Sequence, residues 1–137
     1  MLGAAIGGGS SREVFGVKDK PNAVIKKSKP PFIGANMFEF FIWNAVRSGS
    51  WKDVFGEVLE ISDDGKYLMM ERLDSLSSDE YAQTPSLPEW TNDLKPENFG
   101  KGVDGKIRVR DYAMCNISEA LNSTNTHRYA WQGKSKK

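Results

Sequence analysis

The segment 91–100, with the sequence TNDLKPENFG, places two acids, a base and an amide within six residues. These side chains are Asp93, Lys95, Glu97 and Asn98. Pro96 fixes its own φ and removes one backbone N–H donor, so we expect a loop of defined shape. In such a loop Asp93 and Asn98 can point into one small space. This composition differs from that of a core-building segment, and it predicts a functional site.

A second candidate site lies near the start of the chain, where residues 3–9 hold four of the thirteen glycines. The stretch leads into a strand-like run that includes Val14 and Phe15, which predicts a glycine-rich hairpin. A glycine loop lets backbone N–H groups approach phosphate oxygens that any Cβ would hold away. A flexible start with a tight turn explains the same stretch equally well from these residues alone.

The run 22–27 follows, with β-branched residues and two lysines, and it predicts a strand. Side chains alternate along a strand, so Val24 and Lys26 share one face. An edge strand with protective lysines is the alternative reading of this run.

Apolar residues recur at helical spacing from Asn36 to Val46, which predicts a helix with Asn36 as its N-cap. Glu39 lies inside this helix among three phenylalanines, and a carboxylate amid so much apolar surface needs a cationic partner. Lys26 is the candidate for that partner. A Glu39 side chain that faces solvent is the alternative.

Two strands are expected next, at 54–61 and 66–70, joined by an Asp-Gly turn. The segment 74–88 is rich in Ser, Asp and Pro and predicts a linker with at most a short helix around 78–83.

After the segment 91–100, a turn at 102–106 leads into an alternating strand, 106–110. This strand leads to Asp111. A short helix is expected at 117–121, and the chain after it is expected to be frayed.

Composition bounds the class of protein and its partners. A length of 137 residues allows one compact domain, and a net charge of +1 argues against a nucleic-acid surface. Cys115 is the only cysteine and His127 the only histidine, which excludes an internal disulfide and leaves little for a metal site of these residue types. No apolar run reaches membrane-spanning length and no signal peptide is recognisable, so we expect a cytoplasmic protein with no membrane partner.

The order of these motifs resembles that of the protein-kinase-like superfamily. The letters D-L-K-P-E-N at 93–98 match the second part of the kinase catalytic-loop pattern H-R-D-x-K-P-x-N, although Thr91 and Asn92 stand where His and Arg would be. The run that ends at Lys26 is similar to the kinase V-A-I-K strand. Asp111 opens D-Y-A, which resembles the kinase D-F-G.

The glycine stretch resembles the kinase pattern G-x-G-x-x-G-x-V through Gly7, Gly9 and Val14. Arg12 stands where the third glycine would be, which loosens the match and adds a charge. The segment 69–73 looks like the kinase hinge, with Met70 closing the back of the adenine pocket.

The resemblance covers about residues 5–115 and implies an α+β fold: a kinase-like N-lobe, made of an antiparallel sheet and one main helix, with a strongly reduced C-lobe. The single domain 1–137 would comprise the N-lobe (1–73), a linker (74–88), the catalytic and metal-binding loops (89–115) and a reduced C-terminal segment (116–137). The chain thus looks like a miniature kinase-like protein, similar to short kinase-like proteins of bacteria and phages.

The resemblance also implies roles for individual residues. Asp93 would accept a hydroxyl proton, Lys95 would lie near the γ-phosphate, and Asn98 would act with them. Mg²⁺ would be held by Asn98 and Asp111. ATP would be bound through the glycine loop, the lysine–glutamate pair and the hinge, namely Gly7, Gly9, Ser10, Lys26, Glu39, Glu71 and Leu73.

Two functions follow from the resemblance. The first is a Mg-ATP-dependent phosphotransferase that transfers the γ-phosphate of ATP to a hydroxyl on a protein or small molecule. The alternative is a catalytically weak or inactive kinase-like binding protein that acts by occupying a partner protein. A homodimer or protein partner is expected to cover aromatic residues outside the motifs, namely Trp51, Trp90, Tyr129 and Trp131, unless these fold back as an ordinary core.

Overall fold

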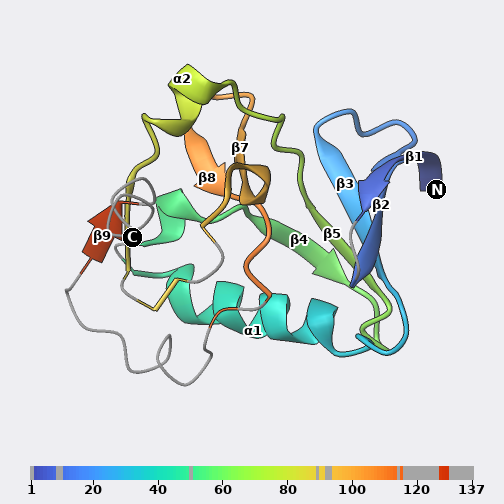
Figure 1. Ribbon diagram of the computed structural model, residues 1–137. Coiled ribbons are helices and arrows are strands. Elements are labelled where there is room, and N and C mark those ends of the chain that lie inside the picture. Colours follow the sequence, from blue (N-terminus) through green and yellow to red (C-terminus); the bar gives the residue numbers. More distant parts are fainter. Residues whose placement is uncertain are drawn as a thin grey trace.

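The structure of the chain is a computed structural model that describes residues 2–8, 11–49, 51–88, 90–91, 94–113 and 115, and the backbone of 127–129. These residues form a small α+β fold with a five-stranded antiparallel sheet and one main helix (Figure 1). The α+β class expected from the sequence is therefore present. The expected domain boundaries within 1–137 stay a prediction. Within these ranges, no helix is both long enough and apolar enough to cross a membrane.

The five-stranded sheet has the order β1-β2-β3-β5-β4, and every neighbouring pair is antiparallel. Its strands are β1 (Leu2–Gly8), β2 (Arg12–Val17), β3 (Ala23–Ser28), β4 (Val58–Ile61) and β5 (Tyr67–Glu71). The glycine-rich hairpin is confirmed as the β1–β2 pair. Gly8 has a φ of 157°, and a Cβ there would lie 2.8 Å from the carbonyl oxygen of Arg12, so the close approach of the two strands requires glycine.

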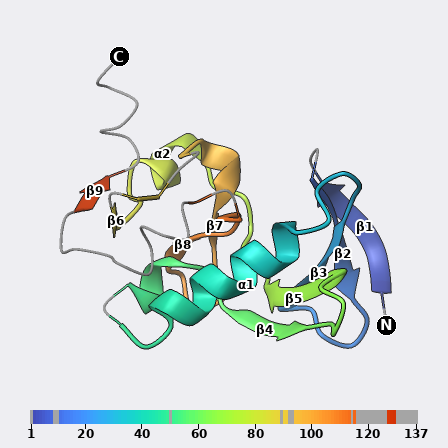
Figure 2. The same ribbon diagram turned by 90° about the horizontal axis from the view of Figure 1, so that it is seen from below.

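Helix α1 (Ala35–Val46) packs against β3, β4 and β5 and runs across the sheet when it is seen from below (Figure 2). Its buried residues, among them Asn36, Glu39, Ile42, Trp43 and Val46, recur at the three- and four-residue spacing of one helix face. A helix predicted from 36 to 46 is thus confirmed. Its buried face includes a carboxylate and an amide, both with no exposed surface.

The predicted N-cap is wrong. The helix begins at Ala35 with Gly34 at the N-cap position and without a side-chain cap, and Asn36 lies inside the first turn. The Nδ2 atom of Asn36 instead donates to the carbonyl oxygens of Lys26, at 3.1 Å, and Lys66, at 2.9 Å. The amide thus joins the helix to β3 and to the turn that leads into β5, and these long-range hydrogen bonds replace a local cap.

The strand predicted from residue 54 is also too long, because β4 begins at Val58 and residues 52–54 form a 3₁₀ turn. Residues 55–57, between this turn and β4, lie outside the five-stranded sheet, and two of them pair with a later segment of the chain. Phe55 forms an isolated bridge with Val109, and the Gly56 N–H donates to the Val109 carbonyl at 2.8 Å. This pairing bends the chain away from the sheet.

The second half of the chain contains short elements, namely α2 (Ser78–Tyr81), β6 (Ser86–Pro88), β7 (Phe99–Lys101), β8 (Ile107–Val109) and β9 (His127–Tyr129). The predicted short helix is confirmed as α2, and Ser77 and Glu80 form a capping box at its N-terminus. The turn at 102–106 joins the β7–β8 hairpin. The expected short helix at 117–121 lies outside the described residues.

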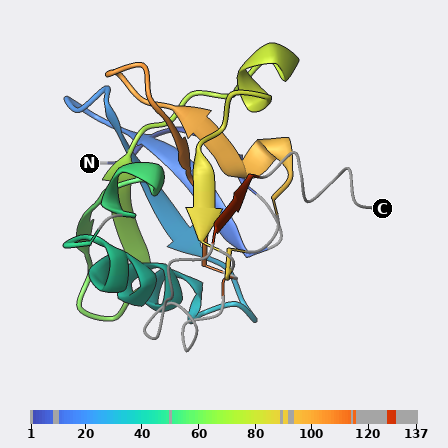
Figure 3. The same cartoon turned by 90° about the vertical axis from the view of Figure 1, so that its left-hand side faces the viewer.

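Strands β6 and β9 pair with each other and lie side by side in Figure 3. Neither was predicted, because β6 lies in the expected linker and β9 in the tail that was expected to be frayed. The paired residues of the two strands are about forty positions apart in the sequence, so no local pattern predicts the pairing.

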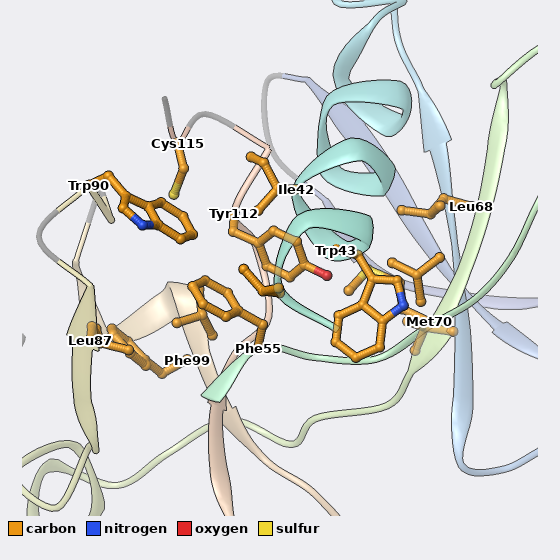
Figure 4. Packing of buried hydrophobic residues seen from close by; sticks show 14 residues of the cluster. Ile42, Trp43, Phe55, Leu68, Met70, Leu87, Trp90, Phe99, Tyr112 and Cys115 are labelled. Atoms are coloured by element: carbon orange, nitrogen blue, oxygen red, sulfur yellow. The ribbon is translucent and has the colours of Figure 1, made fainter. Parts of the chain in front are cut away.

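One continuous core connects α1 and the sheet with the second half of the chain (Figure 4). The Phe55 ring stacks on Trp90 with 5.4 Å between centroids and meets the edge of Tyr112 at 5.1 Å. Trp90 is only 6% exposed, and Trp51 packs against the same core. The expected exposed aromatic patch is therefore wrong for these two residues. The side chain of Tyr129, and all of Trp131, lie outside the described residues.

Candidate functional site

A cleft of about 500 Å³ opens between the β1–β2 hairpin, the end of β5 and the segments at 95–98 and 110–111. Most of the predicted site residues that the structure describes lie on its walls, namely Gly7, Lys26, Glu71, Leu73, Lys95, Asn98 and Asp111. Glu39 does not line the cleft, because it is buried behind Lys26 with no exposed surface. Gly9, Ser10 and Asp93 lie outside the described residues.

The predicted lysine–glutamate pair is present. Lys26 lies on β3 in register with Val14 of β2, and its Nζ atom is 2.8 Å from Oε1 of Glu39 on α1. The same Nζ atom donates to the Arg110 carbonyl oxygen at 2.5 Å. The solvent-facing alternative for Glu39 is excluded by its complete burial.

Arg12 is the principal site residue that sequence reasoning missed. Its guanidinium is 3% exposed, and Nη1 lies 2.6 Å from Glu39 Oε1 and 3.2 Å from Asn36 Oδ1. Nη2 donates to Asp111 Oδ1 at 2.6 Å. An arginine in place of the third glycine is therefore a buried bridge between the hairpin, α1 and Asp111. The available signal was its spacing from Val14, because residues two apart on a strand share a face.

Two cations hold Glu39 ionised. Burial alone would raise the pKa of Glu39, but the charges of Arg12 and Lys26 and their hydrogen bonds outweigh it and lower the pKa to about 2. The pKa of Lys26 is lowered, first by burial and then by the neighbouring charge of Arg12. Glu39 is thus the fixed negative centre of a buried Arg–Glu–Lys cluster, in which the lysine is the more easily deprotonated partner.

Glu39 also positions the segment that carries Asp111. Its second oxygen, Oε2, accepts the backbone N–H of Tyr112 at 2.6 Å. The Tyr112 ring is buried in the core, and its hydroxyl donates to the Gly56 carbonyl at 2.8 Å. The backbone that follows Asp111 is therefore fixed at both its amide and its side chain. The Asp111 carboxylate, 46% exposed, remains on the wall of the cleft.

Arg110 connects the two sides of the cleft floor. Its Nε atom donates to the Glu97 carbonyl at 2.9 Å, Nη1 donates to the Leu73 carbonyl at 2.7 Å, and Nη2 donates to Ser75 Oγ at 3.2 Å. The sequence identified Arg110 only as part of an alternating strand. Three partners spread over residues 73–97 show that it ties the predicted hinge to the loop at 95–98.

The loop at 95–98 is a 3₁₀ turn, η2 (Pro96–Asn98), which starts with the proline that the sequence pointed to. The Asn98 N–H donates to the Lys95 carbonyl at 3.0 Å, and the Asn98 carbonyl accepts the Arg110 N–H at 2.7 Å. The Asn98 side chain is 6% exposed and lines the cleft together with Asp111. The defined loop shape expected from Pro96 is therefore present.

The donor chemistry of Asn98 and Asp111 fits Mg²⁺, which prefers oxygen ligands. In the part of the chain that the structure describes, no group of three or more His, Cys, Asp or Glu side chains could hold a metal by itself.

No protein-family model matches the chain, and no curated protein matches it. Among solved structures, the chain is similar to a co-crystal structure of WbdD and a kinase inhibitor, with 17% sequence identity and a TM-score of 0.47. The match covers 82% of this chain and 32% of the WbdD chain, so the chain spans about a third of that protein's length. A likeness with this identity and TM-score assigns no function to the chain.

Proposed function

We propose that the chain is a Mg-ATP-dependent phosphotransferase of minimal protein-kinase-like fold, in which a kinase-like N-lobe is followed by a strongly reduced C-lobe. The observation that carries the proposal is the buried Lys26–Glu39 pair, whose lysine lines a cleft together with Asp111 and a glycine hairpin. A structural ion pair needs neither a cleft nor a glycine hairpin next to it. Their combination supports the binding of a phosphate-rich ligand.

In this proposal the nucleotide lies along the cleft with its base at the hinge. The Glu71 N–H already donates to the Glu57 carbonyl, and the Leu73 carbonyl already accepts Arg110. The Glu71 carbonyl and the Leu73 N–H are therefore the groups we assign to the base. Lys26, held by Glu39, would bind the α- and β-phosphates, and the N–H groups of the hairpin, including that of Gly7, would approach the phosphate oxygens.

Phosphate transfer would use the loop at 93–98. Asp93 would accept the proton of the acceptor hydroxyl while the oxygen of that hydroxyl bonds to the γ-phosphorus. ADP would leave as the bond between the γ-phosphorus and the β–γ bridging oxygen breaks. Lys95 would stabilise the charge of the transferred group. When bound by Asn98 and Asp111, Mg²⁺ would supply neutralisation of the phosphate charge. The acceptor would be a hydroxyl on a protein or a small molecule.

One observation favours the alternative of a kinase-like binding protein with weak or no catalysis. Asp111, the proposed metal ligand, is ion-paired with Arg12 at 2.6 Å. A permanent pair of this kind would hinder metal binding and leave a cleft that binds ligands without transferring phosphate. A homodimer or a protein partner stays part of both proposals.

Transfer of labelled γ-phosphate, to the protein itself or to a hydroxyl acceptor, tests the proposal. We expect that Asp93→Asn abolishes transfer and leaves the affinity for Mg-ATP within about threefold of the wild type, because the carboxylate acts on the acceptor and not on ATP. Glu97→Gln, in the same loop, is the matched control and should retain transfer. Transfer that persists in Asp93→Asn would assign Asp93 a structural role, whereas a wild type that binds Mg-ATP without transfer would favour the binding protein.

A further inference from the structure

Four charged side chains form a closed cluster at the inner end of the cleft. Arg12 and Lys26 carry the positive charges, and Glu39 and Asp111 carry the negative ones. Three of the four are less than a tenth exposed, and Asp111 alone has substantial access to the cleft. The cluster is therefore neutral without a metal ion. A cation that binds Asp111 enters next to a guanidinium that already holds one of its oxygens.

The two ends of the Arg12 guanidinium are held differently. Nη1 contacts two residues of α1, Glu39 and Asn36, which are fully buried. Nη2 contacts the half-exposed Asp111. If the Asp111 contact is lost, Arg12 still has two buried partners on α1, so the pair with Asp111 can open without release of the whole side chain.

We infer that Arg12 and a divalent metal ion are alternative partners of Asp111, so that loading of the metal exchanges the Arg12–Asp111 ion pair for a metal–carboxylate contact. The backbone after Asp111 is fixed by Glu39 and by the buried Tyr112, so the exchange takes place at the side chains. Arg12 lines the same cleft, so the Nη2 group that is released becomes a donor for phosphate oxygens. The inference rests on the proposed function in taking Asp111 as a metal ligand.

Mn²⁺ alone, without nucleotide, is a suitable probe because it takes the same oxygen ligands as Mg²⁺ and its free concentration can be read by electron paramagnetic resonance. Arg12→Lys keeps a positive charge for Glu39, but one ammonium group cannot hold two carboxylates as the forked guanidinium does. We expect Arg12→Lys to bind Mn²⁺ at least about fivefold more tightly than the wild type, the scale of one partly exposed ion pair. Asp111→Asn in the Arg12→Lys background should abolish that gain.

Arg72→Met is the matched control for a change in cleft charge. Arg72 also lines the cleft, but it pairs with Asp74 at 3.4 Å and takes no part in the cluster. Its substitution should leave Mn²⁺ affinity within about twofold of the wild type, since exposed charges are well screened. Thermal unfolding of each variant shows that it is folded. In the wild-type protein, NMR signals of the arginine side-chain N–H groups give a second readout, because the Arg12 signal should shift as Mg²⁺ is added.

Equal Mn²⁺ affinity of wild type and folded Arg12→Lys, or a gain that survives Asp111→Asn, would overturn the inference. If Arg12→Lys does not fold, an Arg12 signal that stays unchanged at saturating Mg²⁺ overturns it in the same way. ATP titrations separate this outcome from failure of the proposed function. A gain in Mn²⁺ affinity without any ATP binding supports the exchange and contradicts the phosphotransferase. Mg-dependent ATP binding that is identical in wild type and Arg12→Lys supports the nucleotide site and contradicts the exchange.

Discussion

Glu39 shows how a single buried carboxylate can organise a site. It accepts Arg12 and Lys26 at one oxygen and the Tyr112 N–H at the other, and so connects the hairpin, the sheet and the segment of Asp111. Without these partners, a buried carboxylate would be strongly destabilising. The three contacts make ionised Glu39 a condition of the folded state.

The pKa of Glu39 leads to a prediction about acid stability. Its folded-state pKa of about 2 lies below the ordinary value of 4.5, so its contribution is complete above about pH 4.5 and is lost as the pH falls towards 2. We expect the free energy of unfolding to fall by roughly 2 kcal/mol through this group between about pH 5 and about pH 3. Urea unfolding at a series of pH values measures it.

The control for this measurement is Glu60→Gln, which changes an exposed glutamate on β4 and should keep the acid slope. Glu39→Gln should be less stable at neutral pH and should lose most of the slope. A slope that is unchanged in Glu39→Gln would show that other carboxylates cause the acid sensitivity.

At the level of single residues, the sequence predicted the Lys26–Glu39 pair because each residue lay on a strongly patterned element. Arg12 was missed because it was compared with a glycine pattern and counted as a mismatch, although its spacing from Val14 placed it on the face of Lys26. The bond from Glu39 to Tyr112 spans 73 positions and ends on a backbone group, which no residue pattern encodes.

At the level of elements, the site depends on close contact between residues 73–74, which follow β5, and the β7–β8 hairpin. The Asp74 N–H donates to the Lys101 carbonyl at 2.9 Å, and the Lys101 N–H donates back to the Asp74 carbonyl at 2.8 Å. Gly100 lies against Leu73 in this contact, and a Cβ at Gly100 would come within 2.5 Å of the Leu73 Cβ and 2.8 Å of its carbonyl oxygen. The backbone of Leu73 cannot move aside as a flexible side chain would.

We therefore expect Gly100→Ala to destabilise the protein by about 3 kcal/mol or more, the upper range for overpacking. Gly7→Ala is the matched substitution, because a Cβ at Gly7 meets nothing within 4 Å. It should change stability by less than about 0.5 kcal/mol, yet it should weaken nucleotide binding if the Gly7 N–H approaches phosphate. Chemical denaturation of both variants measures the difference, and equal stabilities would contradict the tight packing of Gly100 on Leu73.

Elements with strong local signals were predictable, and elements made by distant pairing were not. The Asp-Gly turn, the β1–β2 hairpin and α1 follow from glycine positions and helical periodicity. Strands β6 and β9 form only by pairing with each other, and the first residues of the strand predicted at 54–61 lie outside β4 because Phe55 pairs with Val109. In each of these wrong predictions, a tertiary contact outweighed a short local pattern.

At the scale of the whole molecule, the aromatic residues of the second half form part of a shared core. Trp90 and Tyr112 of this half pack against Phe55. Exposed large apolar side chains include four on α1 and in the loop before it, namely Phe32, Ile33, Phe38 and Phe41. The expectation of a homodimer or protein partner therefore no longer rests on Trp90.

The most direct test of the account is a calorimetric titration of the full chain with ATP, with and without Mg²⁺. We predict saturable binding to the wild type that Mg²⁺ strengthens. Lys26→Met should weaken binding at least about tenfold in both conditions, or about 1.4 kcal/mol. Asp111→Ala should remove the difference that Mg²⁺ makes. The assignment of the cleft as a nucleotide site would be contradicted if folded wild-type protein gives no saturable heat at millimolar Mg-ATP. It would also be contradicted if Lys26→Met and Asp111→Ala both bind Mg-ATP as tightly as the wild type.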